Sequence, residues 1–174
     1  MCVALAVLDA KVRVTGPDGE REIAFSDFHR LPGDTPQIDT HLQPNEIITA
    51  IELPPQGFAK HYTYLKIRDR LSYAFALISI AVGLEMEGDT VKEARFALGG
   101  VAHKPWRDRD AEASLKGQKA SAENFRKAAD LFLKDAKGFA HNSFKIDLAR
   151  RAIVRTLTQA ARGTPQIQSM KKVR

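Results

Sequence analysis

Residues 74–102 read AFALISIAVGLEMEGDTVKEARFALGGVA, and this stretch carries the clearest structural signal of the 174-residue chain. Its first half places apolar side chains at every second position, namely Ala76, Ile78, Ile80, Val82, Leu84 and Met86. Its second half repeats the alternation at Ala94, Phe96 and Leu98. A period of two puts successive side chains on opposite faces of a strand. Because residues 87–90 (EGDT) form a turn signal, we predict two long strands, 74–86 and 91–102, in a hairpin.

Shorter strands are predicted on the N-terminal side of this hairpin. Residues 11–15 and 22–25 alternate around a Gly-Pro-Asp-Gly turn, and the expected buried face is Val12, Val14, Ile23 and Phe25. Residues 46–53 form a strand that Pro54 and Pro55 end. Residues 58–68 alternate with Tyr62, Tyr64, Lys66 and Arg68 on one face. The Pro- and Gly-rich residues 29–45 between these strands predict a long surface connection.

On the C-terminal side the apolar period changes to that of a helix. We predict helices over 108–116, over 122–137 with Ser121 as its cap and Gly138 as its end, and over 144–161. Strands that precede helices in sequence favour an antiparallel sheet with helices on one face. The fold class predicted from the residues is therefore α+β.

Composition limits the class of protein. A net charge of +6, with 44% hydrophobic and 28% charged residues, is typical of a globular chain. The sequence has no apolar run long enough for a membrane span and no visible signal peptide. The single cysteine, Cys2, excludes an internal disulfide or a cysteine-ligated metal centre built by this chain alone. We interpret Cys2 as an inert thiol on a buried first helix.

The opening residues MCVALAVLDA are apolar almost all round and have no capping residue before them. We favour the interpretation that Met1 is an internal residue of a longer protein whose covering layer is missing. The alternative is a helix that packs into the core of this chain. If the layer is missing, residues 2–10 are expected to drive self-association.

Motifs for catalysis are absent from the sequence. It contains no glycine-rich phosphate loop and no metal-ligand spacing among His29, His41, His61, His103 and His141. Gly99-Gly100 closes a strand and predicts a bend or a close backbone approach. We therefore assign no catalytic and no metal-ligating residue.

Two segments could contact a partner or a ligand. Residues 62–73 (YTYLKIRDRLSY) combine tyrosines with a lysine and arginines, which suits an anionic or aromatic ligand but equally a solvent-facing sheet edge. The last helix carries a basic face that could bind nucleic acid or an acidic protein, although such faces are usually solvated. Its residues, with those that follow, are Arg150, Arg151, Arg155, Arg162, Lys171, Lys172 and Arg174.

Six runs, taken together, resemble a known family. They are MCVALAVLDAKVRV, REIAFSDFHRLPGDTP, PNEIITAIELP, YLKIRDRLSYAFALISIAVGLE, ARFALGGVAHKPWR and HNSFKIDLARRAIVR. Their order and spacing resemble the FAD-binding (flavoprotein, medium) subunit of molybdenum hydroxylases, the family of xanthine dehydrogenase, aldehyde oxidoreductase and carbon monoxide dehydrogenase. The resemblance implies that residues 1–55 are a remnant of an FAD-binding subdomain. It implies that residues 56–174 are the C-terminal domain, with a three-stranded antiparallel sheet on a three-helix bundle.

The resemblance also implies a function. The chain would be part of an oxidoreductase that relays electrons from iron–sulfur clusters through FAD to an acceptor, with the clusters and the molybdenum cofactor on partner subunits. Motif by motif, it places Ile48, Lys66, Arg68, Asp69, Arg70 and Tyr73 at the flavin, where Lys66 would stabilise the reduced, anionic ring. Family members carry a glycine-rich FAD-binding part ahead of the MCVALAVLDA-like helix, so we expect this chain alone to bind FAD weakly or not at all and to be inactive alone. We expect a cytoplasmic location, or a periplasmic one after export with its complex. The alternative function is a stand-alone basic binding module for nucleic acid or an acidic protein.

Overall fold

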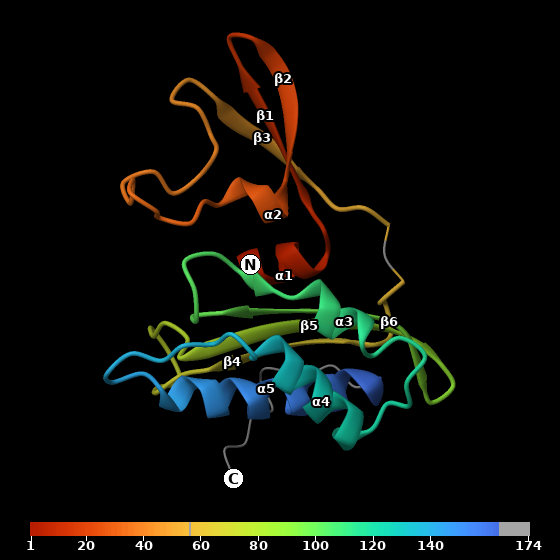
Figure 1. Cartoon of the computed structure of the whole chain (residues 1–174). Helices are drawn as coiled ribbons and strands as arrows, with labels where there is room; N and C mark the ends of the chain where they lie inside the picture. Colours follow the sequence, from red (N-terminus) through yellow and green to blue (C-terminus); the bar gives the residue numbers. More distant parts are fainter. Residues whose placement is uncertain (56, 164–174) are drawn as a thin grey trace.

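The structure is a computed structural model that describes residues 1–55 and 57–163. It contains two antiparallel sheets, with the short helix α1 (Cys2–Val7) lying between them (Figure 1). Helices α4 (Ala122–Phe132) and α5 (Phe144–Ala161) lie on the opposite face of the second sheet from α1, and α3 (Arg109–Ala113) lies beside β6 (Figure 1). The predicted α+β class is confirmed.

The first sheet has the strand order β2-β1-β3. Its strands are β1 (Lys11–Gly16), β2 (Gly19–Ala24) and β3 (Ile47–Glu52). Val12 lies opposite Ile23 in the β1–β2 hairpin, and both are buried as predicted. Phe25 is also buried, but it begins a short helix, α2 (Phe25–Phe28), that was not predicted. The predicted surface connection follows α2 and leads to β3.

The second sheet has the strand order β4-β5-β6-β7. Its strands are β4 (Tyr62–Ile67), β5 (Ile78–Glu87), β6 (Thr90–Gly99) and the two-residue β7 (Trp106–Arg107). The predicted β5–β6 hairpin is confirmed, and Gly88 makes its turn with a φ of +60°. The prediction that the strand begins at Ala74 was wrong, because residues 74–77 belong to the loop before β5. The expectation of three strands in this sheet was wrong, because β7 adds a fourth; β7 is too short for an alternation to be recognised in the sequence.

Helices α3 (Arg109–Ala113), α4 (Ala122–Phe132) and α5 (Phe144–Ala161) enclose the main core with the second sheet. Phe96 of β6 stacks on Phe132 of α4, with 5.1 Å between the ring centroids. The Ser121 hydroxyl caps α4 as predicted by accepting a hydrogen bond from the Asn124 N–H at 3.3 Å. The predicted end of this helix at 137 was wrong, because the last α-helical residue is Phe132.

Small residues on the other face of the second sheet make room for α1. Ala81 of β5 and Ala97 of β6 contact Val3 and Val7 in a separate buried cluster. Next to them, a Cβ atom on Gly99 would lie 2.5 Å from the Val3 Cγ2 atom, which is closer than real Cβ contacts allow. The close approach predicted for Gly99-Gly100 is therefore confirmed.

Helix α1 is apolar on more than one side because it contacts two cores. Leu5 and Ala6 pack against the core of the first sheet, while Val3 and Val7 pack on the second. This arrangement matches the alternative in which the helix packs into the chain's own cores. The prediction of a buried Cys2 was wrong: its side chain lies on the first turn of α1 and is exposed.

Candidate functional site

The candidate site lies at the end of β4 and in the loop of residues 68–77 that joins it to β5. Lys66 is partly buried, and its Nζ atom donates a hydrogen bond to the Ala74 carbonyl oxygen at 2.8 Å. This bond crosses the base of the loop, so the ammonium group is held in one place. An ammonium group has three donors, and the Ala74 carbonyl accepts one of them.

The tip of this loop is also held by a cation. Arg70 donates from Nε to the Tyr73 carbonyl oxygen at 3.1 Å, and a second donor, Nη2, reaches the same oxygen. Its guanidinium lies 5.9 Å from the centre of the Tyr73 ring. Tyr73 has a φ of +47°, which is unusual for a bulky residue. The ring itself is 95% exposed.

Apolar side chains flank Tyr73 on the same loop. Leu71 is 75% exposed and Phe75 is 99% exposed. Arg68, which is partly buried, and the exposed Asp69 lie at the start of the loop. The loop therefore presents apolar and aromatic groups next to positive charge, which is the chemistry that a flat, anionic ligand requires.

Ile48, the sixth predicted residue, lies in the other sheet. It is opposite Val14 in the β1–β3 register, so the two side chains share a face of the first sheet. Val14 is fully buried, but Ile48 is 44% exposed because β3 is an edge strand with less cover. The structure thus divides the predicted site between two sheets that meet around α1 (Figure 1).

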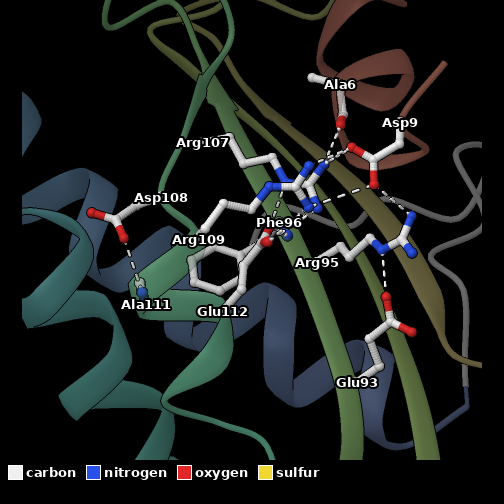
Figure 2. Close-up of polar contacts among 10 residues, drawn as sticks. All are labelled: Ala6, Asp9, Glu93, Arg95, Phe96, Arg107, Asp108, Arg109, Ala111 and Glu112. Carbon is white, nitrogen blue, oxygen red and sulfur yellow. Dashed lines mark hydrogen bonds and ion pairs between the residues drawn. The ribbon is translucent and has the colours of Figure 1, made fainter. Parts of the chain in front are cut away.

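An ion cluster that the sequence analysis missed joins these two sheets. Asp9 follows α1 with a φ of +51°, and three arginines converge on its carboxylate (Figure 2). Oδ1 lies 2.6 Å from Arg107 Nη1 and 2.6 Å from Arg109 Nη2, and Oδ2 lies 2.8 Å from Arg95 Nη1. Burial raises the pKa of Asp9, but the Arg109 hydrogen bond and the charges of all three arginines lower it by more, so the net shift is downward.

The second half of the cluster is buried against α3. Arg107 is 9% exposed and donates from Nε and Nη2 to the two oxygens of Glu112, at 2.6 and 3.0 Å. The Phe96 N–H also donates to Glu112 Oε1 at 2.9 Å. A single sequence gives no signal for a contact between Asp9 and an arginine 98 positions away.

The basic face of α5 is partly neutralised. Arg150 lies 2.6 Å from the Asp130 carboxylate, and Arg151 lies 2.8 Å from that of Asp147. Arg155 is exposed. Lys171, Lys172 and Arg174, which were part of the predicted basic surface, lie outside the described residues.

The side chains present limit the kinds of site. Among residues 1–55 and 57–163, no group of three or more His, Cys, Asp or Glu side chains could hold a metal ion. No helix in this part of the chain is both long and apolar enough to cross a membrane.

Two family descriptions match the chain. Residues 61–160 match the CO dehydrogenase flavoprotein C-terminal domain. Residues 1–56 match the FAD binding domain in molybdopterin dehydrogenase.

Curated relatives and a solved structure agree with these matches. The aldehyde oxidoreductase FAD-binding subunit PaoB of Escherichia coli K12 is 45% identical over 161 residues, which are 92% of this chain and 47% of that protein. The glyceraldehyde dehydrogenase medium chain of Sulfolobus acidocaldarius is 31% identical over 119 residues, 68% of this chain and 40% of that protein. A structure of reconstituted CO dehydrogenase from Oligotropha carboxidovorans superposes with a TM-score of 0.81 at 25% identity, covering 94% of this chain and 57% of that one. The chain spans about half the length of the curated relatives it matches.

Proposed function

Because this chain belongs to the family of FAD-binding flavoprotein subunits of molybdenum hydroxylases, we propose that it supplies one wall of an FAD site in such an enzyme. The observation that carries this proposal is the loop after β4. Lys66 and Arg70 hold it through the carbonyl oxygens of Ala74 and Tyr73, and it leaves the Tyr73 ring exposed.

The residues present fit a flavin. Lys66 offers a fixed positive charge, and Tyr73 offers an exposed flat surface. Arg68 and Asp69 flank the loop and would contact polar groups at the edge of the ring. The half-exposed Ile48 would give an apolar contact from the first sheet.

When bound, FAD supplies the electron-accepting chemistry. The role of Lys66 would be to place a positive charge beside the ring, which favours the reduced, anionic state. The role of the loop would be to fix the ring and to cover it from water. We assign no proton transfer to any of these residues. We therefore propose that they bind and orient the cofactor, and we assign no catalytic residue.

The wider assembly belongs to the same proposal. Residues 1–55 would be part of the FAD-binding subdomain and residues 56–174 the C-terminal domain. Iron–sulfur clusters and a molybdenum cofactor would lie on partner subunits, and electrons would pass from them through FAD to an acceptor. The complex would lie in the cytoplasm, or in the periplasm after export as one assembly.

Residues 2–10 would also allow self-association in the absence of other subunits. An apolar groove of about 370 Å³ lies beside α1 and is lined in part by Ala4, Leu8 and Phe58. Light scattering at increasing protein concentration tests this point, and a constant monomer mass would contradict it.

Nuclear magnetic resonance can test the FAD site even if binding is weak. FAD is titrated into the ¹⁵N-labelled chain, and amide shifts are followed for the wild type, Lys66→Met and Lys60→Met. Lys60 is an exposed lysine just before β4 and is the matched control. We expect shifts at residues 66–75 and at Ile48, and a clear loss of binding in Lys66→Met alone. Shifts elsewhere on the surface, or equal losses in both variants, would contradict the proposal.

A further inference from the structure

We propose that Asp9 is a positioning residue: its carboxylate, held by Arg95, Arg107 and Arg109, fixes the first sheet relative to the second. This inference rests on the proposed function in one respect, which is that Ile48 and the Lys66 loop contact the same cofactor. The placement of the two sheets then decides whether these residues form one site.

Asp9 lies in the turn between α1 and the first strand of the first sheet. Helix α1 packs on the second sheet, whereas β1, which starts at Lys11, belongs to the first. Asp9 and Ala10 join the two. The Ala10 N–H donates to the Leu5 carbonyl oxygen at 3.1 Å, and the Ala10 carbonyl accepts from the Phe25 N–H at 2.9 Å. The turn at Asp9 therefore sets the direction in which β1 leaves α1.

The arginines all come from the other side of this junction. Arg95 lies on β6, Arg107 on β7 and Arg109 at the start of α3, so all three belong to the second sheet or the helix beside it (Figure 2). Arg107 Nη1 also donates to the Ala6 carbonyl oxygen at 2.6 Å. The cluster consequently holds the end of α1 and the turn after it from one side.

Another polar contact between the first sheet's part of the chain and the second's is weaker than the ion pairs of Asp9. Lys104 Nζ donates to the Ser26 carbonyl oxygen at 3.1 Å, which is an exposed bond to a neutral acceptor. The Lys104 bond is a single contact of one charge with a neutral carbonyl, whereas Asp9 forms ion pairs with three arginines at 2.6–2.8 Å. The carboxylate of Asp9 should therefore contribute most to the angle between the sheets.

The variant Asp9→Asn isolates this contribution. Asparagine has nearly the same shape and tolerates a left-handed φ, so the backbone turn is preserved while the charge is removed. Arg107 keeps its two bonds to Glu112, so no buried charge in the second core is left alone. Replacing Arg107 instead would leave Glu112 buried without its partner and would destabilise the whole fold.

The experiment measures the distance between the sheets in the 174-residue chain. Spin labels are attached at Glu20→Cys on β2 and Arg126→Cys on α4, both exposed positions, with Cys2→Ser removing the native thiol. Pulsed electron resonance then gives the distance distribution. Asp89→Asn is the matched control, because Asp89 forms an exposed ion pair with Lys119 at 3.1 Å in the β5–β6 turn.

We expect Asp9→Asn to broaden or shift the distance distribution and Asp89→Asn to leave it unchanged. In the FAD titration, Asp9→Asn should lose the shift at Ile48 while Lys66 still responds. An unchanged distribution in Asp9→Asn would overturn the inference, even if the variant melted at a lower temperature. If FAD shifts amides elsewhere on the wild-type surface but neither Ile48 nor Lys66, the proposed function fails, whereas the label distance still decides the role of Asp9.

Discussion

The substitution Gly99→Ala tests how closely α1 lies on the second sheet. The new Cβ would lie 2.5 Å from Val3 Cγ2 and 2.7 Å from Ser79 Oγ, whereas ordinary contacts begin near 3.4 Å. The helix must therefore move outward by several tenths of an ångström or more, which partly opens the contacts of Val3 and Val7. Overpacking of this kind costs about 1–3 kcal/mol. For a chain of this size a loss of about 2 kcal/mol lowers Tm by about 4–8 °C.

A double-mutant cycle with Val3→Ala separates the clash from other effects. Val3 is buried, and removing its two methyl groups alone should cost about 1.5 kcal/mol. The same change removes the Cγ2 atom that the new Cβ would meet, so the double variant should be more stable than additivity predicts by about 1 kcal/mol. The rescue is partial because Ser79 Oγ remains. Gly57→Ala is the control, since its Cβ would meet the flexible Glu85 carboxylate at 3.3 Å.

Urea unfolding followed by circular dichroism gives the free energy of unfolding for each variant. Additive losses in the cycle, within about 0.5 kcal/mol, would refute the packing of Val3 on Gly99. A loss in Gly57→Ala as large as in Gly99→Ala would show that glycine replacement itself is responsible.

Three further predictions concern a helix cap, a pKa and the core. Asp108→Ala should cost about 1 kcal/mol in unfolding free energy and Asp110→Ala much less, because the Asp108 carboxylate accepts from the Ala111 N–H at 2.9 Å whereas Asp110 lies within the first turn. The carboxyl of Glu46 should titrate with a pKa of about 2 by carbon NMR, because its hydrogen bond with Arg21 lowers the pKa. In Arg21→Gln this pKa should move back toward 4.5. The stability that this pair contributes is therefore complete above pH 4.5 and is lost as the pH falls through about 2. Phe132→Ala should cost about 3–5 kcal/mol in urea unfolding, since its ring is fully buried against Phe96, and a loss below about 1 kcal/mol would contradict this packing.

The fold could be predicted where local pattern and tertiary burial agree. The β5–β6 hairpin shows this, because its alternating side chains face a helix layer on one side and its turn needs a glycine with positive φ. The prediction failed where a tertiary contact decides the boundary. β5 begins at Ile78, and in the loop before it the carbonyls of Ala74 and Tyr73 accept hydrogen bonds from Lys66 and Arg70, which no periodicity reports.

The candidate site was predictable as a set of residues but not as an arrangement. The motif resemblance selected Ile48 and the Lys66 loop and assigned them to two domains, but it did not predict how the two sheets are held against each other around α1. The exposure of Cys2 and the ion cluster at Asp9 were missed for the same reason, since both depend on how α1 lies against the second sheet. A helix pattern gives the apolar side chains of α1 but does not say which of two cores each one enters.

The relative position of Ile48 and Lys66 depends on how the two sheets are held together. Residues on one rigid sheet keep their spacing, whereas the spacing of residues on two sheets depends on what is packed between the sheets. Here that element is a six-residue helix, too short to be stable alone, followed by a turn with the left-handed Asp9. Its geometry must therefore come from its contacts, which are the small-residue face under Val3 and the arginines around Asp9. A change at either contact should alter the response of Ile48 to FAD before it alters that of Lys66, because Lys66 is held within its own sheet.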